Sequence, residues 1–528
     1  MSQLTGTRNR WPIVISVLAT TFLSAMESTV VSTAMPTVAG ALGGVELYSW
    51  VFTAYLMTTT VTTPLWGKLA DLFGRKRTLM AGVVLFLTGS ALCGRSGSMV
   101  QLILFRALQG LGAGAVLPVT MTIFGDLFDV AERARYQGLL GSVWGFSALV
   151  GPALGSTILS TLGWRWIFYV NLPIGVVAAL LLAVYLREQV PDRRSRLDWA
   201  GAGLLSGAVT AVLLAMALGG TYRPWDDPVV VGLLVLGLIL AVAFVWVEAR
   251  AAEPILPLDL FRVPIIGAAS AASVFFGVVL FATSAYVPLF VQGVLGRDQR
   301  TTALVVTSMS IAWPIASALS ARAILRWGFR PSAVAGHTLQ LLAMALWIGL
   351  WPLWLRLPPG LATGLALGIT LTAGAGFGLS NSAYFIGVQN AVPWTRRGVA
   401  TGTLTFIRAL GQTVGGAVLG SLLGARLRAA LAGVPGLEVS DLGHGGLEAA
   451  VTGFASLAPV RQAFLDAVGP VLLATVGAAV LGLLFSLRVP PGVPISAGAA
   501  TGAPAGANGG PTAAAGGGKL AGDLPGGK

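Results

Sequence analysis

Residues 11–36 read WPIVISVLATTFLSAMESTVVSTAMP, and the only ionisable side chain in this stretch is that of Glu27. A hydrocarbon core of about 30 Å is crossed by about 20 apolar residues in a helix, and the stretch supplies them. A carboxylate at that depth costs roughly 2.5–3.5 kcal/mol on insertion scales, so Glu27 is expected to face a bundle interior or a watery cavity. Low dielectric penalises its charged form, which makes Glu27 a candidate proton-binding group. The alternative is a structural acid that is held by hydrogen bonds and never titrates.

The composition is that of an integral membrane protein. Of the 528 residues, 55% are hydrophobic and only 10% are charged, whereas a soluble domain carries about 25% charged residues. The net charge of +13 lies mainly in short loops between apolar stretches, so we expect no nucleic-acid partner. One cysteine and two histidines exclude an intramolecular disulfide and an ordinary zinc site. No ATP-binding or catalytic motif is present, so we expect no enzyme and no cofactor.

Fourteen apolar stretches are candidate membrane spans. Their ranges are roughly 11–35, 48–66, 78–94, 99–124, 137–160, 166–186, 199–218, 229–247, 265–290, 302–321, 332–354, 361–387, 399–424 and 467–487. If the N-terminus is cytoplasmic, 22 of the Lys and Arg residues fall inside and nine fall outside. This positive-inside bias predicts an all-α fold with fourteen transmembrane helices and both termini in the cytoplasm.

A weak repeat divides the chain. The segment GKLADLFGRK, which starts at Gly67, follows the second stretch, and ARAILRWGFR, which starts at Ala321, follows the tenth. Alignment of Gly74 with Gly328 suggests two six-helix halves, which is a common transporter architecture. The predicted organisation is an N-terminal bundle (1–196), two inserted helices (197–250), a C-terminal bundle (251–490) with an outside loop (425–466), and a disordered Gly/Ala/Pro-rich tail (491–528).

The loop that follows the second stretch carries the first family resemblance. It resembles the signature of the major facilitator superfamily, in which Gly, Asp, Gly and Arg precede a further basic residue. The resemblance implies that its residues latch the two halves at their cytoplasmic ends; they are Gly67, Asp71, Gly74, Arg75, Lys76 and Arg77. The alternative for the three basic residues is that they only set topology.

Three further stretches resemble the fourteen-helix drug:proton antiporter branch, drug:H+ antiporter family 2. They are MESTVVSTAMP from Met26, WRWIFYVNLPIG from Trp164 and EARAAEPILP from Glu248. The first departs from the family pattern, because Glu27 stands where the family usually has Asp. The resemblance implies that Glu27 takes part in proton coupling and can bind a substrate cation.

Arg106 is a second charge inside a span, in the segment RALQGLGAGA, which is similar to the superfamily's fourth-helix motif. Glu27 lies about 24 Å from the inner edge of the core, and Arg106 lies about 10 Å from the outer edge. In a core of about 30 Å, these two positions lie within a few ångströms of the same depth. A glutamine or a backbone carbonyl near Gln109 is an alternative partner. The family reading assigns Arg106 to proton transfer, and the alternative is a structural ion pair.

Small residues in the fifth stretch resemble the antiporter motif of proton-driven exporters, with Gly141 followed by Gly145, Gly151, Pro152 and Gly155. The alternative is ordinary close packing of Gly-rich membrane helices. Polar and aromatic residues that could line a cavity, or could equally face lipid or the core, are Tyr55, Gln109, Trp144, Tyr286, Asn381, Tyr384, Gln389 and Arg408.

We therefore expect a monomeric, multi-pass protein of a bacterial plasma (inner) membrane. Its expected partners are the lipid bilayer, protons and drug-like small molecules, and the proton gradient is the expected energy source. The expected function is export of amphipathic or cationic compounds in exchange for protons. The alternatives are an exporter of a single metabolite, antibiotic or lipid, and a membrane scaffold or sensor that transports nothing.

Overall fold

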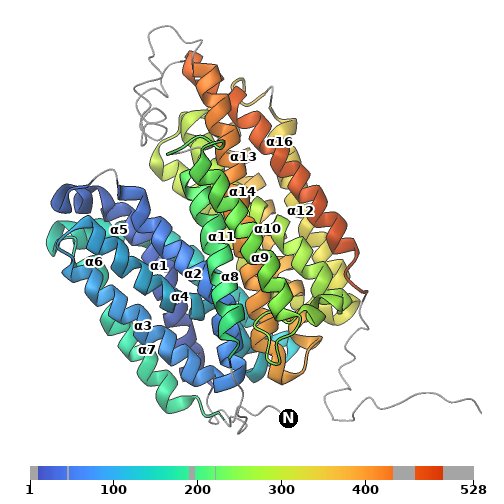
Figure 1. Cartoon of the computed structure of the whole chain (residues 1–528). Helices are drawn as coiled ribbons and strands as arrows, with labels where there is room; N and C mark the ends of the chain where they lie inside the picture. Colours follow the sequence, from blue (N-terminus) through green and yellow to red (C-terminus); the bar gives the residue numbers. More distant parts are fainter. Residues whose placement is uncertain are drawn as a thin grey trace, which may run out of the picture. The chain divides into compact units, whose positions relative to one another are not determined.

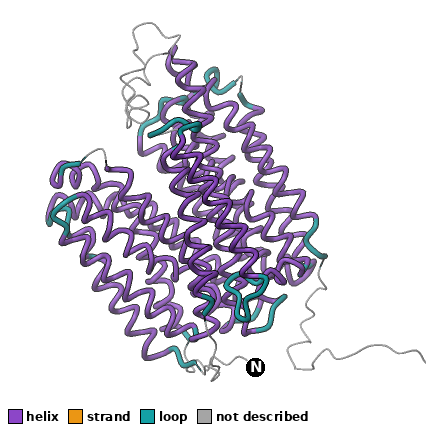
Figure 2. Tube along the Cα trace, in the orientation of Figure 1, coloured by secondary structure: helices purple, strands orange, loops and turns teal. Residues whose placement is uncertain are grey.

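The computed structural model of the chain describes residues 10–44, 47–188, 197–219, 222–351, 353–431 and 458–491. These ranges consist of helices joined by turns and contain no β-strand (Figures 1 and 2). The predicted all-α class is therefore confirmed. Residues 432–457 of the predicted outside loop and residues 492–528 of the predicted tail lie outside the described ranges.

The helices follow the predicted stretches in order. The first seven are α1 (Trp11–Leu42), α2 (Tyr48–Phe73), α3 (Arg75–Arg95), α4 (Met99–Leu127), α5 (Val130–Thr161), α6 (Trp166–Tyr169) and α7 (Asn171–Tyr185). The others are α8 (Trp199–Leu218), α9 (Pro228–Glu248), the 3-10 turn η2 (Leu258–Arg262), α10 (Pro264–Gly293), α11 (Gln299–Trp327), α12 (Phe329–Gly349), α13 (Pro359–Asn390), the 3-10 turn η3 (Trp394–Arg396), α14 (Arg397–Leu431) and α16 (Ala458–Leu487).

Most helices run beyond the apolar stretches that predict them, and a capped polar turn accounts for the extension of some, such as α5. At the start of α5, Asp129 accepts a hydrogen bond of 2.8 Å from the N–H of Glu132, and the Glu132 side chain accepts one from the N–H of Asp129. Likewise, α14 and α16 extend into both ends of the predicted loop 425–466. The sixth stretch is split between α6 and α7, since Pro173 has no N–H to donate to the carbonyl of Tyr169.

Twelve helical spans in the described ranges are long and apolar enough to cross a membrane, counting α6 and α7 as one. The long helices α2 and α5 fall outside this set. Large apolar side chains such as Leu238 and Val242 are exposed on the outer faces of the helices, where a bilayer would cover them. Length and hydropathy therefore support twelve of the fourteen predicted crossings.

The same packing pattern recurs in the two predicted halves. In the first, α2 and α3 pack on α4, and α1 packs on α5; in the second, α11 and α12 pack on α13, and α10 packs on α14. The two aligned glycines occupy equivalent turns with positive φ, 92° at Gly74 and 86° at Gly328. The contacts thus follow the repeat that the sequence suggests.

The most extensive contacts between the halves are those of α2 with α14 and of α5 with α11. The inserted helices α8 and α9 pack on each other, and α8 also contacts both α2 and α14 (Figure 1). After α9, Glu253 pairs with Lys68 of α2 at 2.7 Å, and Asp259 pairs with Arg396 at 2.6 Å. The inserted pair and the segment that follows it therefore cover one of the two seams between the halves.

Candidate functional site

Glu27 and Arg106, two charges predicted inside the membrane, are ion-paired. Arg106 of α4 donates from Nη1 to Oε1 of Glu27 in α1 at 2.5 Å, and each side chain is only 1% exposed. The pairing agrees with the similar depths that the sequence gives these two residues, and Glu27 is one of the partners that it left open for Arg106. Pairing offsets part of the cost of burying either charge alone.

Further polar groups complete the surroundings of the pair. Arg106 also donates to Gln109 Oε1 at 2.9 Å and to the carbonyl of Val51 at 3.4 Å, so the alternative partners considered from the sequence are contacted as well. Its guanidinium carbon lies 4.2 Å from the ring centroid of Tyr55. The second carboxylate oxygen of Glu27 accepts a 2.5 Å hydrogen bond from Asn171 Nδ2. Both oxygens of the acid are therefore held by donors.

Asn171 is a site residue that the sequence reasoning did not single out. It is the first residue of α7, it is fully buried, and its Nδ2 also donates to Ser90 Oγ at 3.0 Å. The start of α7 thus places this side chain against α1 and α3. A lone carboxamide two residues before a proline, in an otherwise apolar stretch, was the signal that could have revealed it.

The glycines of α5 face two different neighbours. A Cβ at Gly145 would lie 2.5 Å from Cβ of Ser310 in α11, whereas one at Gly155 would lie 3.3 Å from Cβ of Thr33 in α1. Gly151 also faces α1, at Thr29, whose hydroxyl donates to the carbonyl of Ser147 at 3.2 Å. The glycines of the predicted antiporter motif therefore pack partly against α11 and partly against the Thr29–Thr33 segment of α1. Pro152 lies within α5, and its side chain is outside the described set.

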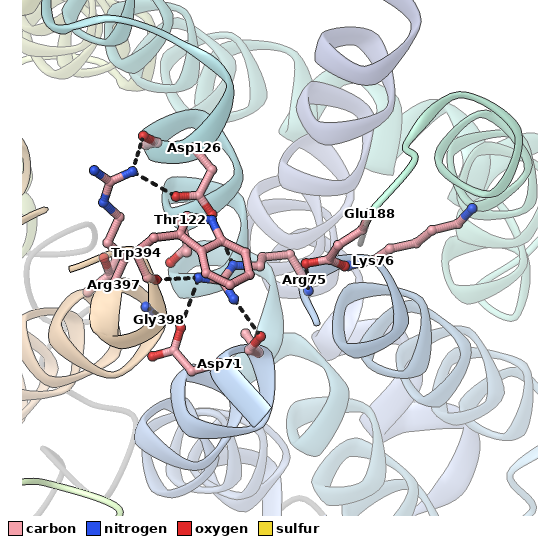
Figure 3. Close-up of polar contacts among 12 residues, drawn as sticks. Asp71, Arg75, Lys76, Thr122, Asp126, Glu188, Trp394, Arg397 and Gly398 are labelled. Atoms are coloured by element: carbon pink, nitrogen blue, oxygen red, sulfur yellow. Dashed lines mark hydrogen bonds and ion pairs between the residues drawn. The ribbon is translucent and has the colours of Figure 1, made fainter. Parts of the chain in front are cut away.

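A second polar cluster joins the halves at the predicted cytoplasmic end (Figure 3). The Asp71 carboxylate, on α2, accepts from the N–H groups of Gly398 at 2.9 Å and Val399 at 2.7 Å. These two groups belong to the first turn of α14, where unpaired backbone donors and the helix dipole favour an anion. Asp71 therefore caps a helix of the other half.

Arg75 lies at the centre of this cluster. It pairs with Asp71 and with Asp126 of α4, both at 3.0 Å, and donates to the carbonyl of Trp394 at 2.7 Å. Its guanidinium carbon also lies 3.9 Å from the centroid of the Trp394 ring (Figure 3). On the other half, Arg397 pairs with Asp126 at 2.9 Å. Two arginines therefore share one buried aspartate across the seam.

The remaining basic residues of the Gly67–Arg77 loop differ in their contacts. Lys76 donates from Nζ to the carbonyl of Ala183 at 2.5 Å, whereas Arg77 is exposed. Glu188 accepts from the N–H groups of Arg75 and Lys76 at 2.8 and 2.9 Å, and so caps α3. Arg77 therefore makes none of the contacts that join the halves.

Asp126, Glu188 and the pairing role of Arg397 were not predicted. The usable signal was the position of Asp126 at the inner end of an apolar stretch, where Lys or Arg is the usual residue. Glu188 lies beyond α7, and only the three-dimensional structure places it at the start of α3.

The geometry explains why two positions of the loop are occupied by glycine. A Cβ on Gly67 would lie 2.6 Å from the carbonyl oxygen of Gly398 and 3.1 Å from Cα of Gly402, so any side chain would push α2 away from α14. Gly74, with a φ of 92°, adopts a left-handed conformation that other residues rarely take.

The predicted cavity residues divide among several environments. Trp144 is exposed and Tyr286 is buried in the apolar core of the second half. Tyr384 contacts His337 Nδ1 at 3.0 Å and Ser486 Oγ at 2.6 Å, also in the interior of that half. Gln389 donates to the carbonyl of Met121 at 3.0 Å, across the halves. Asn381 and Arg408 contact each other, and Tyr55 and Gln109 belong to the Glu27 site.

Comparison with known proteins agrees with this architecture. The sequence model of the Major Facilitator Superfamily matches residues 17–416. The chain is 34% identical over 414 residues to the multidrug transporter protein MdtP of Bacillus subtilis, covering 78% of this chain and 75% of that protein. It is 32% identical over 410 residues to multidrug resistance protein 3 of the same organism, covering 78% and 79%.

A solved structure gives the same fold. That of the proton:xylose symporter XylE superposes with a TM-score of 0.59 at 14% identity, covering 92% of this chain and 97% of the other. The two chains therefore share their fold. The chain belongs to the Major Facilitator Superfamily. It is a multi-pass membrane protein.

Proposed function

We propose that this protein is a proton-coupled multidrug efflux transporter that exports amphipathic or cationic compounds in exchange for protons. The names of its relatives support multidrug transport. The observation that carries the coupling proposal is the buried pair of Glu27 with Arg106, because an intramembrane acid is the group that can carry a proton across.

In the proposed cycle, Glu27 takes a proton from the outside and releases it to the cytoplasm. Ionised Glu27 is held by Arg106 and Asn171, and a proton on the carboxyl group weakens both contacts. A substrate cation and a proton would compete for the same carboxylate. This competition supplies the difference in substrate affinity between states that alternating access requires.

The second part of the proposal concerns the cluster of Asp71, Arg75, Asp126 and Arg397. It would act as a latch that holds the cytoplasmic ends of the two bundles together in one state and opens in the other. Gly67 and the glycines of α5 would permit the close helix contacts that form in one state and separate in the other. Lys76 would anchor the loop, and Arg77 would contribute to topology.

The proposed topology has fourteen crossings, with two six-helix bundles, two inserted helices and both termini in the cytoplasm. Long helices at α2 and α5, which lie inside the repeat, support the two crossings beyond the twelve apolar ones. The proposed location is the plasma membrane of a bacterium, and the proposed functional unit is a monomer.

The test uses everted membrane vesicles that contain the wild-type protein and an imposed proton gradient. We expect gradient-driven uptake of ethidium, which a protonophore abolishes. A growth-inhibition panel of chemically unrelated drugs should show protection against several of them. Protection against one compound alone would favour a dedicated exporter, and no transport of any compound would favour a scaffold or sensor.

A further inference from the structure

Arg408 is a cation near the middle of the membrane. It lies 11 residues after the first residue of α14, which corresponds to about 16 Å along the helix in a core of about 30 Å. Its Nη1 donates to Asn381 Oδ1 of α13 at 2.9 Å. Its guanidinium carbon lies 5.8 Å from the ring centroid of Phe276 and 5.5 Å from that of Phe385. The guanidinium is therefore held between one carboxamide and two aromatic faces.

No carboxylate of the described ranges lies within ion-pair distance of Arg408. Arg75 and Arg106, the fully buried arginines of the described ranges, differ in this respect, since Arg106 has Glu27, and Arg75 has Asp71 and Asp126. A carboxamide oxygen and two rings only partly replace a negative charge. An unneutralised cation at this depth is expensive, and such residues generally mark a site for a ligand or ion.

Part of the Arg408 residue is accessible to a ligand. Arg408 is only partly buried, whereas Asn381, Phe276 and Phe385 are buried around it. A guanidinium presents five donors in a planar fork that matches the oxygens of a carboxylate or similar oxyanion. The single bond to Asn381 fixes the orientation of that fork and uses one of its donors.

We propose that Arg408, oriented by Asn381, binds the carboxylate or a related oxyanion of an amphipathic substrate. Phe276 and Phe385 would contact the apolar part of that substrate next to the acidic group. This inference rests on the proposed efflux function and deepens it, because it adds amphiphiles with an acidic group, zwitterions included, to the substrates that bind through Glu27.

The test compares two dyes that differ only in their acidic group, rhodamine B, which has a free carboxylate, and its ethyl ester. Gradient-driven uptake into everted vesicles would be measured for the wild type, Arg408→Gln and Arg408→Lys. The control variant is Arg356→Gln, which removes the same charge at an exposed residue between α12 and α13. Sensitivity to a protonophore separates driven uptake from leakage.

We expect Arg408→Gln to reduce uptake of the carboxylate dye by about ten- to a hundredfold, the usual range for a lost charged hydrogen bond, and to leave uptake of the ester within about twofold. Arg408→Lys should retain part of the carboxylate uptake, and Arg356→Gln should retain all of it. Retained ester transport also shows that the variant folds.

Three results would overturn the inference while leaving efflux intact. They are equal loss of both dyes in Arg408→Gln, no loss of either, and a wild type that transports the ester but not the carboxylate dye. A wild type that transports neither dye nor ethidium would instead overturn the proposed efflux function, and this inference with it.

Discussion

Arg106 donates a 2.5 Å hydrogen bond to the carboxylate of Glu27 and so joins α4 to α1 across 79 residues of sequence. Neither residue has another residue of opposite charge within ion-pair distance in the described ranges. Removal of one partner would therefore leave the other charge buried and unpaired. The pair should behave as one unit in stability and in transport.

The stability of the Glu27–Arg106 pair can be measured by a double-mutant cycle. We expect Arg106→Gln to lower the free energy of unfolding by about 3–5 kcal/mol, because Glu27 would lose its charged partner. Addition of Glu27→Gln to that variant should recover a large part of the loss. Chemical unfolding of the purified protein in detergent provides the values. Additive effects of the two substitutions would contradict the coupling.

Asn171 should influence the pH dependence of transport. Asn171→Ala removes the donor to Glu27 Oε2 and so destabilises the ionised acid. We expect the alkaline limb of the pH profile of transport, where Glu27 fails to take up a proton, to move to higher pH. Ser90→Ala is the control, because it removes only the second contact of Asn171 and should shift the profile less. An unchanged profile in Asn171→Ala would show that the contact is only structural.

The predicted cytoplasmic end should open more readily without the charge on Asp71. A Cys93→Ser protein with Thr63→Cys carries one reporter thiol on α2, close to Gly402 of α14. We expect Asp71→Asn to raise the rate of maleimide labelling from the cytoplasmic side about tenfold or more, since removal of one partner of a buried pair generally costs several kcal/mol.

The control for Asp71→Asn is Asp259→Asn, which breaks a more exposed ion pair at the same seam. Exposed pairs contribute about 0–1 kcal/mol, so the labelling rate should change by no more than about fivefold. Equal labelling rates in the Asp71 variant and its parent would show that Asp71 does not hold the two bundles together.

Gly67 should be intolerant of a side chain. Gly67→Ala places a methyl group against the backbone of Gly398, so the α2–α14 contact cannot form as described. We expect transport of ethidium to fall below about a tenth of the wild-type rate, which corresponds to a loss of more than about 1.4 kcal/mol in the free energy of the α2–α14 contact. Gly420→Ala on α14 is the matched control, because the nearest atom to its added Cβ lies 3.8 Å away. Equal rates in the two variants would contradict the role of the close contact.

The fold was largely predictable because membrane helices follow simple physical rules. Apolar length identified most spans, and the depth of Glu27 along α1 matched that of Arg106 along α4 closely enough to predict their pairing. Helix ends were less predictable, since capped polar turns such as the one at Asp129 extend beyond the hydrocarbon. Length and hydropathy alone support twelve crossings, whereas the repeat requires α2 and α5 as well.

The sites were less predictable than the helices. Asp126 and Asn171 depend on which helices pack together, and no local pattern encodes that packing. Asp71 was recognised from its loop, but its partner, the first turn of α14, lies 327 residues away. The resemblance to a family supplied the importance of the loop, and only the structure supplied its contacts.

The most direct test of proton coupling through Glu27 uses purified protein in proteoliposomes with an imposed pH gradient. Glu27→Gln is compared with Asp226→Asn, an acid-to-amide change at an exposed residue between α8 and α9. We predict that Glu27→Gln abolishes gradient-driven accumulation of ethidium but retains ethidium exchange without a gradient, and that Asp226→Asn retains both. Full gradient-driven accumulation by Glu27→Gln would contradict the account and show that the coupling proton binds elsewhere.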